Sequence, residues 1–166
     1  MKKIAFFFVA FSLLTFSFSF IDKETFSGVG LSPGSKSPQI KIEGKSFNAK
    51  DLDVKAGEYV LLNFWASYDA VSRISNVRFN TIADQQSDKL HYVSVSYDKN
   101  IRVFEETVKL DKVNADYQYF DAAGADSDLY KRFRLQNGFT NYLIDKDGII
   151  VAKNISPEKL TELLGQ

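Results

Sequence analysis

YVLLNFWASYDAVSR, residues 59–73, is the stretch that decides the fold of this chain. Residues 59–66 form a nearly continuous apolar run of strand length. Such a run predicts a central strand that is buried on both faces of a sheet. Asp69 follows within three residues and belongs to the residue types most favoured at the N-cap of a helix. The stretch therefore predicts a buried strand that turns directly into a helix.

The helix that Asp69 opens is predicted to end at about Gln86. Apolar residues recur along it at Val71, Ile74 and Ile82, and side chains at helical spacing share one face. We therefore expect these three side chains to form the buried face of the helix.

The rest of the chain alternates strand and helix signals. Further strands are expected at 40–42, 90–97 and 117–120, with residues 47–52 capping the sheet edge. Helices are expected at 100–109, 126–133 and 157–164, and a hairpin at 140–145 and 149–152 around the turn at 146–148. The helix at 100–109 is expected to bury Ile101, Phe104 and Val108. This order predicts an α/β domain with a mixed central sheet flanked by helices on both faces.

Three blocks of the sequence resemble motifs of one superfamily. PGSKSP at 33–38 is similar to an entry motif Pro-Gly-x-x-Ala-Pro, residues 59–73 to a catalytic strand and helix start, and YLIDKDGII at 142–150 to a hairpin Phe-Leu-Ile-Asp-x-x-Gly-x-Ile. These are motifs of the thioredoxin-like superfamily, in its periplasmic thiol-disulfide oxidoreductase and peroxiredoxin branch. The resemblance implies a thioredoxin-like fold over residues 39–166.

The departures from the family pattern fall where its chemistry would be. Asp69 and Ser72 occupy the positions of the two redox cysteines, and the chain has no cysteine. Thiol-disulfide exchange requires a thiolate, which neither a carboxylate nor a hydroxyl replaces. We therefore expect a degenerate member with no catalytic residue, no cofactor and no thiol chemistry.

Two further substitutions reshape the same region. Phe139 stands where the family has a proline with a cis peptide bond, and a cis bond without proline costs about 3 kcal/mol, so we expect a trans peptide. Tyr68 replaces the second tryptophan of the family, which leaves Trp65 as the only tryptophan. Phe139 is expected either at the surface or folded inward against Trp65.

Other chemistries are weakly supported by the sequence. Ser72 as a nucleophile needs a neighbouring base, but the only histidine, His91, begins a different strand. Asp69 at a helix N-terminus is better explained as a cap than as a catalyst. A metal site is not expected, because the acidic cluster Asp121, Asp126 and Asp128 lacks the spacing of a calcium loop.

The N-terminal residues predict export. Lys2 and Lys3 precede an uncharged run at 4–21, and Ser17 and Ser19 are small residues two apart, as at a signal-peptide cleavage site. We therefore expect a signal peptide at 1–19, a lead-in or linker at 20–38 and a periplasmic or extracellular location. The alternative is an uncleaved segment that anchors the protein in the inner membrane.

The composition of the chain limits the kinds of partner that it is expected to bind. The 21 basic residues balance the 21 acidic ones without a long block of either sign, so no nucleic-acid surface is expected. The sequence favours a non-catalytic module that binds an envelope protein or peptide through Tyr68, Asp69, Phe139 and Thr140. The alternatives are a cysteine-free accessory subunit of an oxidoreductase or peroxiredoxin system, and an unrelated hydrolase or metal-dependent enzyme on the same fold.

Overall fold

The protein is built around a mixed five-stranded sheet in the strand order β5-β4-β3-β6-β7. The computed structural model describes residues 28–42, 45–47, 55 and 58–165, so the predicted signal peptide and its cleavage site lie outside the described residues. The strands of this sheet are β3 (Tyr59–Trp65), β4 (Leu90–Ser96), β5 (Gln118–Phe120), β6 (Asn141–Asp145) and β7 (Ile150–Lys153). Strand β3 is parallel to β4 and antiparallel to β6, which confirms both the mixed sheet and the central, buried strand.

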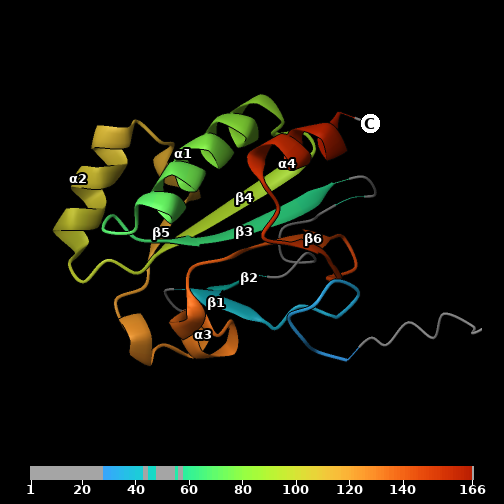
Figure 1. Cartoon of the computed structure of the whole chain (residues 1–166), viewed down its shortest axis with the longest axis horizontal. Coiled ribbons are helices and arrows are strands. Elements are labelled where there is room, and N and C mark those ends of the chain that lie inside the picture. Colours follow the sequence, from blue (N-terminus) through green and yellow to red (C-terminus); the bar gives the residue numbers. More distant parts are fainter. Residues whose placement is uncertain (1–27, 43–44, 48–54, 56–57, 166) are drawn as a thin grey trace, which may run out of the picture.

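Helices cover both faces of the sheet, as the sequence predicts (Figure 1). They are α1 (Ala70–Gln85), α2 (Ile101–Asp111), α3 (Asp128–Arg132) and α4 (Pro157–Leu164). Helices α1 and α4 lie on one face, where Phe79 and Leu160 belong to one buried cluster. Helix α3 lies on the other face, where Phe133 packs with Phe64 of β3. The two cores meet at β3, whose side chains alternate between them.

Helix α1 contradicts the prediction for Val71 and Ile74, whereas Ile82 is partly buried and packs against the core. Val71 and Ile74 are 77% and 61% exposed, whereas Ser72, Asn76 and Asn80 are buried. These three polar residues recur every four positions and so share one side of the helix. The apolar pattern predicted the helix but not its orientation, because polar groups that find hydrogen-bond partners can be buried.

The polar side of α1 is held by a buried network centred on Asn76. Its Oδ1 accepts hydrogen bonds from Tyr92 Oη and Ser94 Oγ, each at 2.7 Å, and its Nδ2 donates to Gln118 Oε1 at 3.1 Å. The network joins α1 to β4 and β5. Burial also raises the pKa of the Tyr92 phenol well above its ordinary value, so this hydroxyl remains a donor.

Helix α2 follows its prediction only in part. Asn100 caps it, and Val108 is buried beside Trp65, Val77 and Phe104. Ile101, however, is 50% exposed. It is the first residue of the helix and lies ahead of the turns that pack on the sheet.

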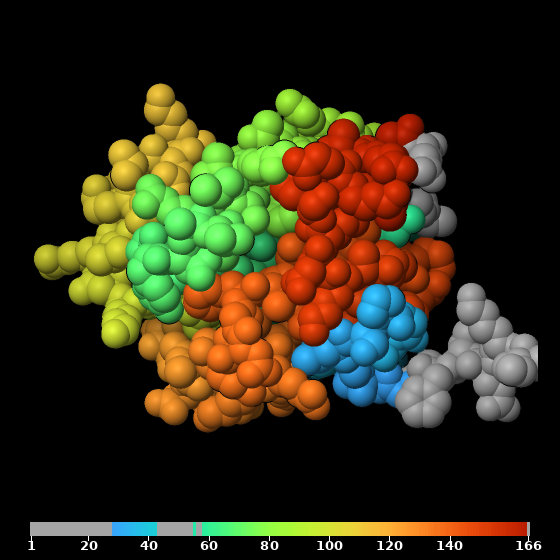
Figure 2. Space-filling view, viewed as in Figure 1, coloured from blue at the N-terminus to red at the C-terminus, as the bar shows by residue number. Residues whose placement is uncertain are grey.

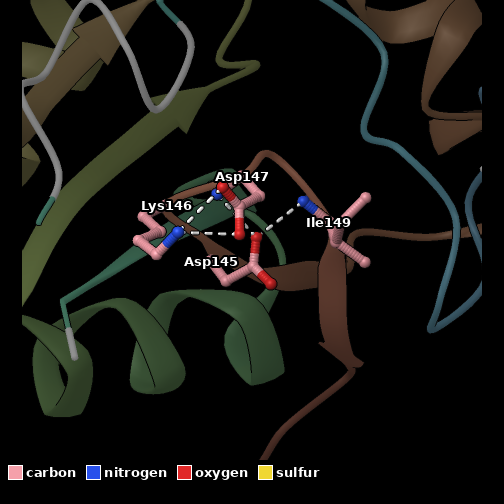
Figure 3. A network of polar contacts seen from close by, with 4 residues as sticks. All are labelled: Asp145, Lys146, Asp147 and Ile149. Carbon is pink, nitrogen blue, oxygen red and sulfur yellow. Dashed lines mark hydrogen bonds and ion pairs between the residues drawn. The ribbon is translucent and has the colours of Figure 1, made fainter. Parts of the chain in front are cut away.

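The hairpin of β6 and β7 is confirmed, and its turn is built by one carboxylate (Figure 3). Asp145 Oδ1 accepts hydrogen bonds from the backbone N–H groups of Asp147 and Ile149, both at 2.9 Å. Gly148 has φ of 80°, a conformation that glycine adopts without strain. The Lys-Asp-Gly sequence therefore matches the turn that the strands require.

The lead-in segment is tied to the far edge of this hairpin. Gly34 N–H donates to the carbonyl of Ile150, and Ile150 N–H donates to the carbonyl of Ser35. Strand β1 (Ile40–Ile42) then pairs with β2 (Lys45–Phe47) in a separate two-stranded sheet. Most of the segment 47–52, which is expected to cap the sheet edge, lies outside the described residues. Within the described part of the chain, no helix has the length and apolar character needed to cross a membrane.

Candidate functional site

The site predicted from the sequence lies where β3 ends and α1 begins. Asp69 adopts extended backbone angles, and its Oδ1 accepts the backbone N–H of Ser72 at 2.8 Å. The carboxylate therefore caps the first turn of α1, as the sequence predicts. One of the two former cysteine positions thus has a structural role in the helix start.

Ser72, the second of these positions, is buried and hydrogen-bonded. Its Oγ donates to the carbonyl of Asp69 at 3.2 Å and accepts the backbone N–H of Ala66 at 3.4 Å. The only histidine of the chain lies at the other end of the sheet, where His91 near the start of β4 is 3.2 Å from Glu58. The hydroxyl bonds to backbone groups, and no hydrogen bond joins it to a basic side chain among the described residues, so the arrangement does not activate it as a nucleophile.

A carboxylate that the sequence analysis missed lies beside this helix start. Asp98 is 3% exposed, and its two oxygens accept hydrogen bonds from Ser67 N–H at 2.9 Å, Ser67 Oγ at 2.6 Å and Ser96 Oγ at 2.8 Å. It therefore fastens the loop after β3 to the end of β4. The available signal was an acid two residues after the buried strand β4, which runs parallel to β3 and ends at the same edge of the sheet.

Four aromatic side chains beside the site contact one another in succession. We call them the aromatic row: Tyr68, Phe139, Tyr97 and Tyr130. The ring centroids of Tyr68 and Phe139 are 6.3 Å apart, Phe139 stacks on Tyr97 at 6.1 Å, and Tyr97 meets Tyr130 edge-on at 5.1 Å. Tyr68 is 67% exposed and Tyr97 only 5%. The row thus runs from the surface into the core.

The position of Phe139 differs from both sequence expectations. It is half-buried, and it packs on the Tyr97 side of the sheet, not against Trp65. Trp65 lies in the cluster under α2. Strand side chains alternate between faces, and Trp65 therefore points away from the aromatic row. The described residues contain no cis peptide bond, which confirms the trans peptide predicted before Phe139.

Thr140 is the fourth residue of the predicted surface, and its backbone bonds to strand β3. Its carbonyl accepts the N–H of Phe64 at 3.1 Å, and the residue is half-buried beside Phe139. Its Oγ1 is buried and has no hydrogen-bond partner among the described residues. The structure thus brings all four predicted residues to one end of the sheet, with Tyr68 as the most accessible.

The electrostatics of the surface keep its phenol neutral. Partial burial, together with Tyr130, Asp98 and Asp69, raises the pKa of Tyr68. A neutral phenol both donates and accepts hydrogen bonds. In the described part of the chain, no three His, Asp or Glu residues come together as a metal site would require.

Comparison with known proteins agrees with this geometry. A thioredoxin-like protein from Parabacteroides distasonis is 41% identical, and the match covers 82% of this chain and 97% of that one with a TM-score of 0.74. The C-terminal domain of a protein assigned as a thiol-disulfide oxidoreductase in Bacteroides thetaiotaomicron is 25% identical, with a TM-score of 0.65 over 81% and 94% of the two chains. Thioredoxin-like protein YneN of Bacillus subtilis is 26% identical over 136 residues, which are 74% of this chain and 71% of that protein. No family model matches the chain.

The mixed sheet, the strand that runs into a capped helix and the final hairpin define an α/β protein of thioredoxin-like architecture. The chain belongs to the thioredoxin-like family, as a member without cysteine.

Proposed function

We propose that the protein is a non-catalytic, exported thioredoxin-like module that binds an envelope protein or peptide through Tyr68, Asp69, Phe139 and Thr140. The observation that carries the proposal is the exchange at the two former redox positions. Asp69 caps α1 and Ser72 is buried in hydrogen bonds, and the chain has no thiol to turn over. The exposed Tyr68, supported from beneath by Phe139, is left as the prominent group of this surface.

Aromatic residues anchor protein interfaces because they bury a large area with few rotatable bonds. The Tyr68 ring is exposed and contacts the ring of Phe139 on one side, so most of its surface is open to a partner. Its neutral hydroxyl can bond to a backbone group of a partner. These properties suit recognition of a polypeptide.

The test is capture from the organism's own cell envelope. Immobilised wild-type protein, Tyr68→Ala and the control Val151→Ala are incubated with the same extract, and bound proteins are quantified by mass spectrometry. Val151 is 40% exposed on β7, an edge strand that β6 separates from β3. We expect at least one protein that wild type and control retain and Tyr68→Ala loses by about tenfold. Binding that does not depend on Tyr68 would contradict the proposal.

A second candidate is a cysteine-free accessory subunit of a thiol-disulfide oxidoreductase or peroxiredoxin system. It is supported by the assignment of the Bacteroides thetaiotaomicron relative as a thiol-disulfide oxidoreductase. This candidate requires the Tyr68-dependent partner in the capture experiment to be a protein with redox cysteines. A partner without cysteine would favour the independent module.

A further inference from the structure

The sequence contains one Asn-Gly pair, Asn137-Gly138, which directly precedes the surface residues Phe139 and Thr140. Asn137 ends the 3₁₀ helix η3 (Leu135–Asn137), and both members of the pair are exposed. Figure 2 shows the orange atoms of this part of the chain on the surface of the molecule, next to the green atoms of α1. The pair is therefore accessible to water.

The fold requires the glycine of this pair but not the asparagine. Gly138 has φ of 115°, a backbone conformation that glycine adopts without strain. The backbone of Asn137 is not left-handed, and its side chain forms no hydrogen bond with any described residue. An unbonded side-chain amide thus lies next to a backbone nitrogen whose own residue has no Cβ.

An asparagine that precedes glycine can lose its amide nitrogen without an enzyme, because no Cβ hinders the attack. The backbone nitrogen of Gly138 bonds to Cγ of Asn137, and the side-chain nitrogen leaves as ammonia with the proton of that backbone nitrogen. Water then adds to one of the two carbonyls of the resulting five-membered imide and opens it. One product is aspartate, and the other is isoaspartate, in which the main chain runs through Cβ.

One hydrogen bond restrains the attacking nitrogen. The N–H of Gly138 donates to the carbonyl of Leu135 at 3.0 Å, and this bond must open before the nitrogen reaches Cγ of Asn137. Helix η3 has only three residues, and the hydrogen bonds of 3₁₀ helices have poorer geometry than those of α-helices. Exposed segments with few contacts open locally while the core stays folded. The bond therefore slows the reaction without preventing it.

The chain is fixed on both sides of the pair. Leu135 is 2% exposed, and the carbonyl of Thr140 accepts the N–H of Phe64 at 3.1 Å. Isoaspartate at position 137 adds one atom to the main chain between these two fixed points. Phe139 lies within the lengthened stretch and is only half-buried, so its ring is the large group that is able to move.

We propose that Asn137-Gly138 is a spontaneous deamidation site, and that its isoaspartate form separates Phe139 from Tyr68 and Tyr97. The rings of Tyr68 and Tyr97 are the two neighbours of Phe139 in the aromatic row. Both products also place a new carboxylate two residues before Phe139. The effect on partner binding rests on the function proposed above, whereas the modification itself does not.

The modification is tested by incubating the purified protein at mildly alkaline pH and quantifying deamidation of each asparagine by peptide mass spectrometry. Asn154 is the matched internal control, because it is exposed and its side chain is likewise unbonded among the described residues, but it precedes isoleucine. We expect Asn137 to react at least about tenfold faster than Asn154 and to give both aspartate and isoaspartate. A rate at Asn137 equal to that at Asn154 would overturn the proposal.

The displacement of Phe139 is tested with Asn137→Gln, whose longer side chain would need a larger ring and therefore stays intact. Backbone amide resonances of Phe139 and Tyr97 should shift in aged wild-type protein and stay unchanged in the aged variant. Resonances that do not shift in a sample containing isoaspartate would overturn the displacement.

Capture from the cell envelope links the modification to binding. Aged wild-type protein should lose its Tyr68-dependent partner by about tenfold, and aged Asn137→Gln should retain it. If no partner depends on Tyr68, the proposed function fails, while the mass and resonance measurements still decide the modification and the displacement. The two failures are therefore distinguishable.

Discussion

The two sides of helix α1 depart from the simple amphipathic pattern, in which only apolar residues are buried and only polar residues are exposed. Its inner side carries Asn76 and Asn80, both buried, and its outer side carries Val71 and Ile74, both exposed. The inner side is stable because Asn76 is hydrogen-bonded to β4 and β5 and Asn80 is hydrogen-bonded to Asp84 and to the backbone of Asn114. The outer side has no such partner within the described residues. The comparison teaches that specific polar contacts orient this helix and leave its apolar residues available to another surface.

The largest expected effect is at the centre of the inner side. Asn76→Ala removes the acceptor of Tyr92 and Ser94 and the donor to Gln118, so buried polar groups lose their partners. We expect the free energy of unfolding to fall by about 3 kcal/mol. Urea denaturation followed by circular dichroism measures it.

The matched control on the outer side is Ile74→Ala. This side chain is 61% exposed, so the change should stay within about 0.5 kcal/mol. Equal losses for the two variants would show that the buried network does not orient the helix.

Phe139→Ala should have the next largest effect. The ring stacks on the buried Tyr97 and also contacts the exposed Tyr68, so it is neither a core residue nor a free surface residue. We expect a loss of about 2 kcal/mol in unfolding free energy, between the values for surface and core aromatics. A loss below about 1 kcal/mol would mean that the aromatic row does not form in solution.

Asp69→Ala tests the N-cap of helix α1. Loss of the hydrogen bond from the Ser72 N–H should lower the unfolding free energy by about 1 kcal/mol, as for other N-caps. Asp69→Ser retains a capping oxygen and should be nearly neutral. If the alanine variant loses much more, the carboxylate has a further partner besides this N–H.

The smallest effect concerns Arg78, which pairs with Glu158 of α4 on the exposed side of α1. The hydrogen bond from Arg78 lowers the pKa of Glu158 from its ordinary value of 4.5 to about 2. Since the folded-state pKa lies below the unfolded one, the stabilisation is present above pH 4.5 and is lost as the pH falls toward about 2. Arg78→Gln should therefore flatten the decline of unfolding free energy in this window. An unchanged pH profile would show that the pair is absent in solution.

Local sequence signals predicted much of this fold. The apolar run of β3, the cap at Asp69 and the Lys-Asp-Gly turn each depend on neighbouring residues, and all three are confirmed. The orientation of α1 was not predictable in this way, because Gln118, which bonds to Asn76, is 42 residues away along the chain. Periodicity alone therefore assigned the wrong face to Ile74.

The candidate site likewise has features that the sequence predicted and features that depend on contacts between distant segments. Resemblance to the family located the end of β3 and the four surface residues, because it compares positions along the chain. It did not reveal Asp98, whose role depends on Ser67 in another loop. Nor could it place Phe139, whose stacking partner Tyr97 comes from the end of β4, a distant segment of the chain. Side-chain contacts between distant segments are the part that the sequence left open.

The most direct measurement asks whether Asp69 and Ser72 truly occupy the redox positions of a thioredoxin-like fold. The double variant Asp69→Cys and Ser72→Cys places two thiols across the first turn of α1, within normal bridging distance. After mild oxidation, intact-mass analysis should show one intramolecular disulfide, and the variant should catalyse insulin reduction by dithiothreitol, which the wild-type protein cannot do without a thiol. Two thiols that stay free under the same oxidant would contradict the assignment of these positions.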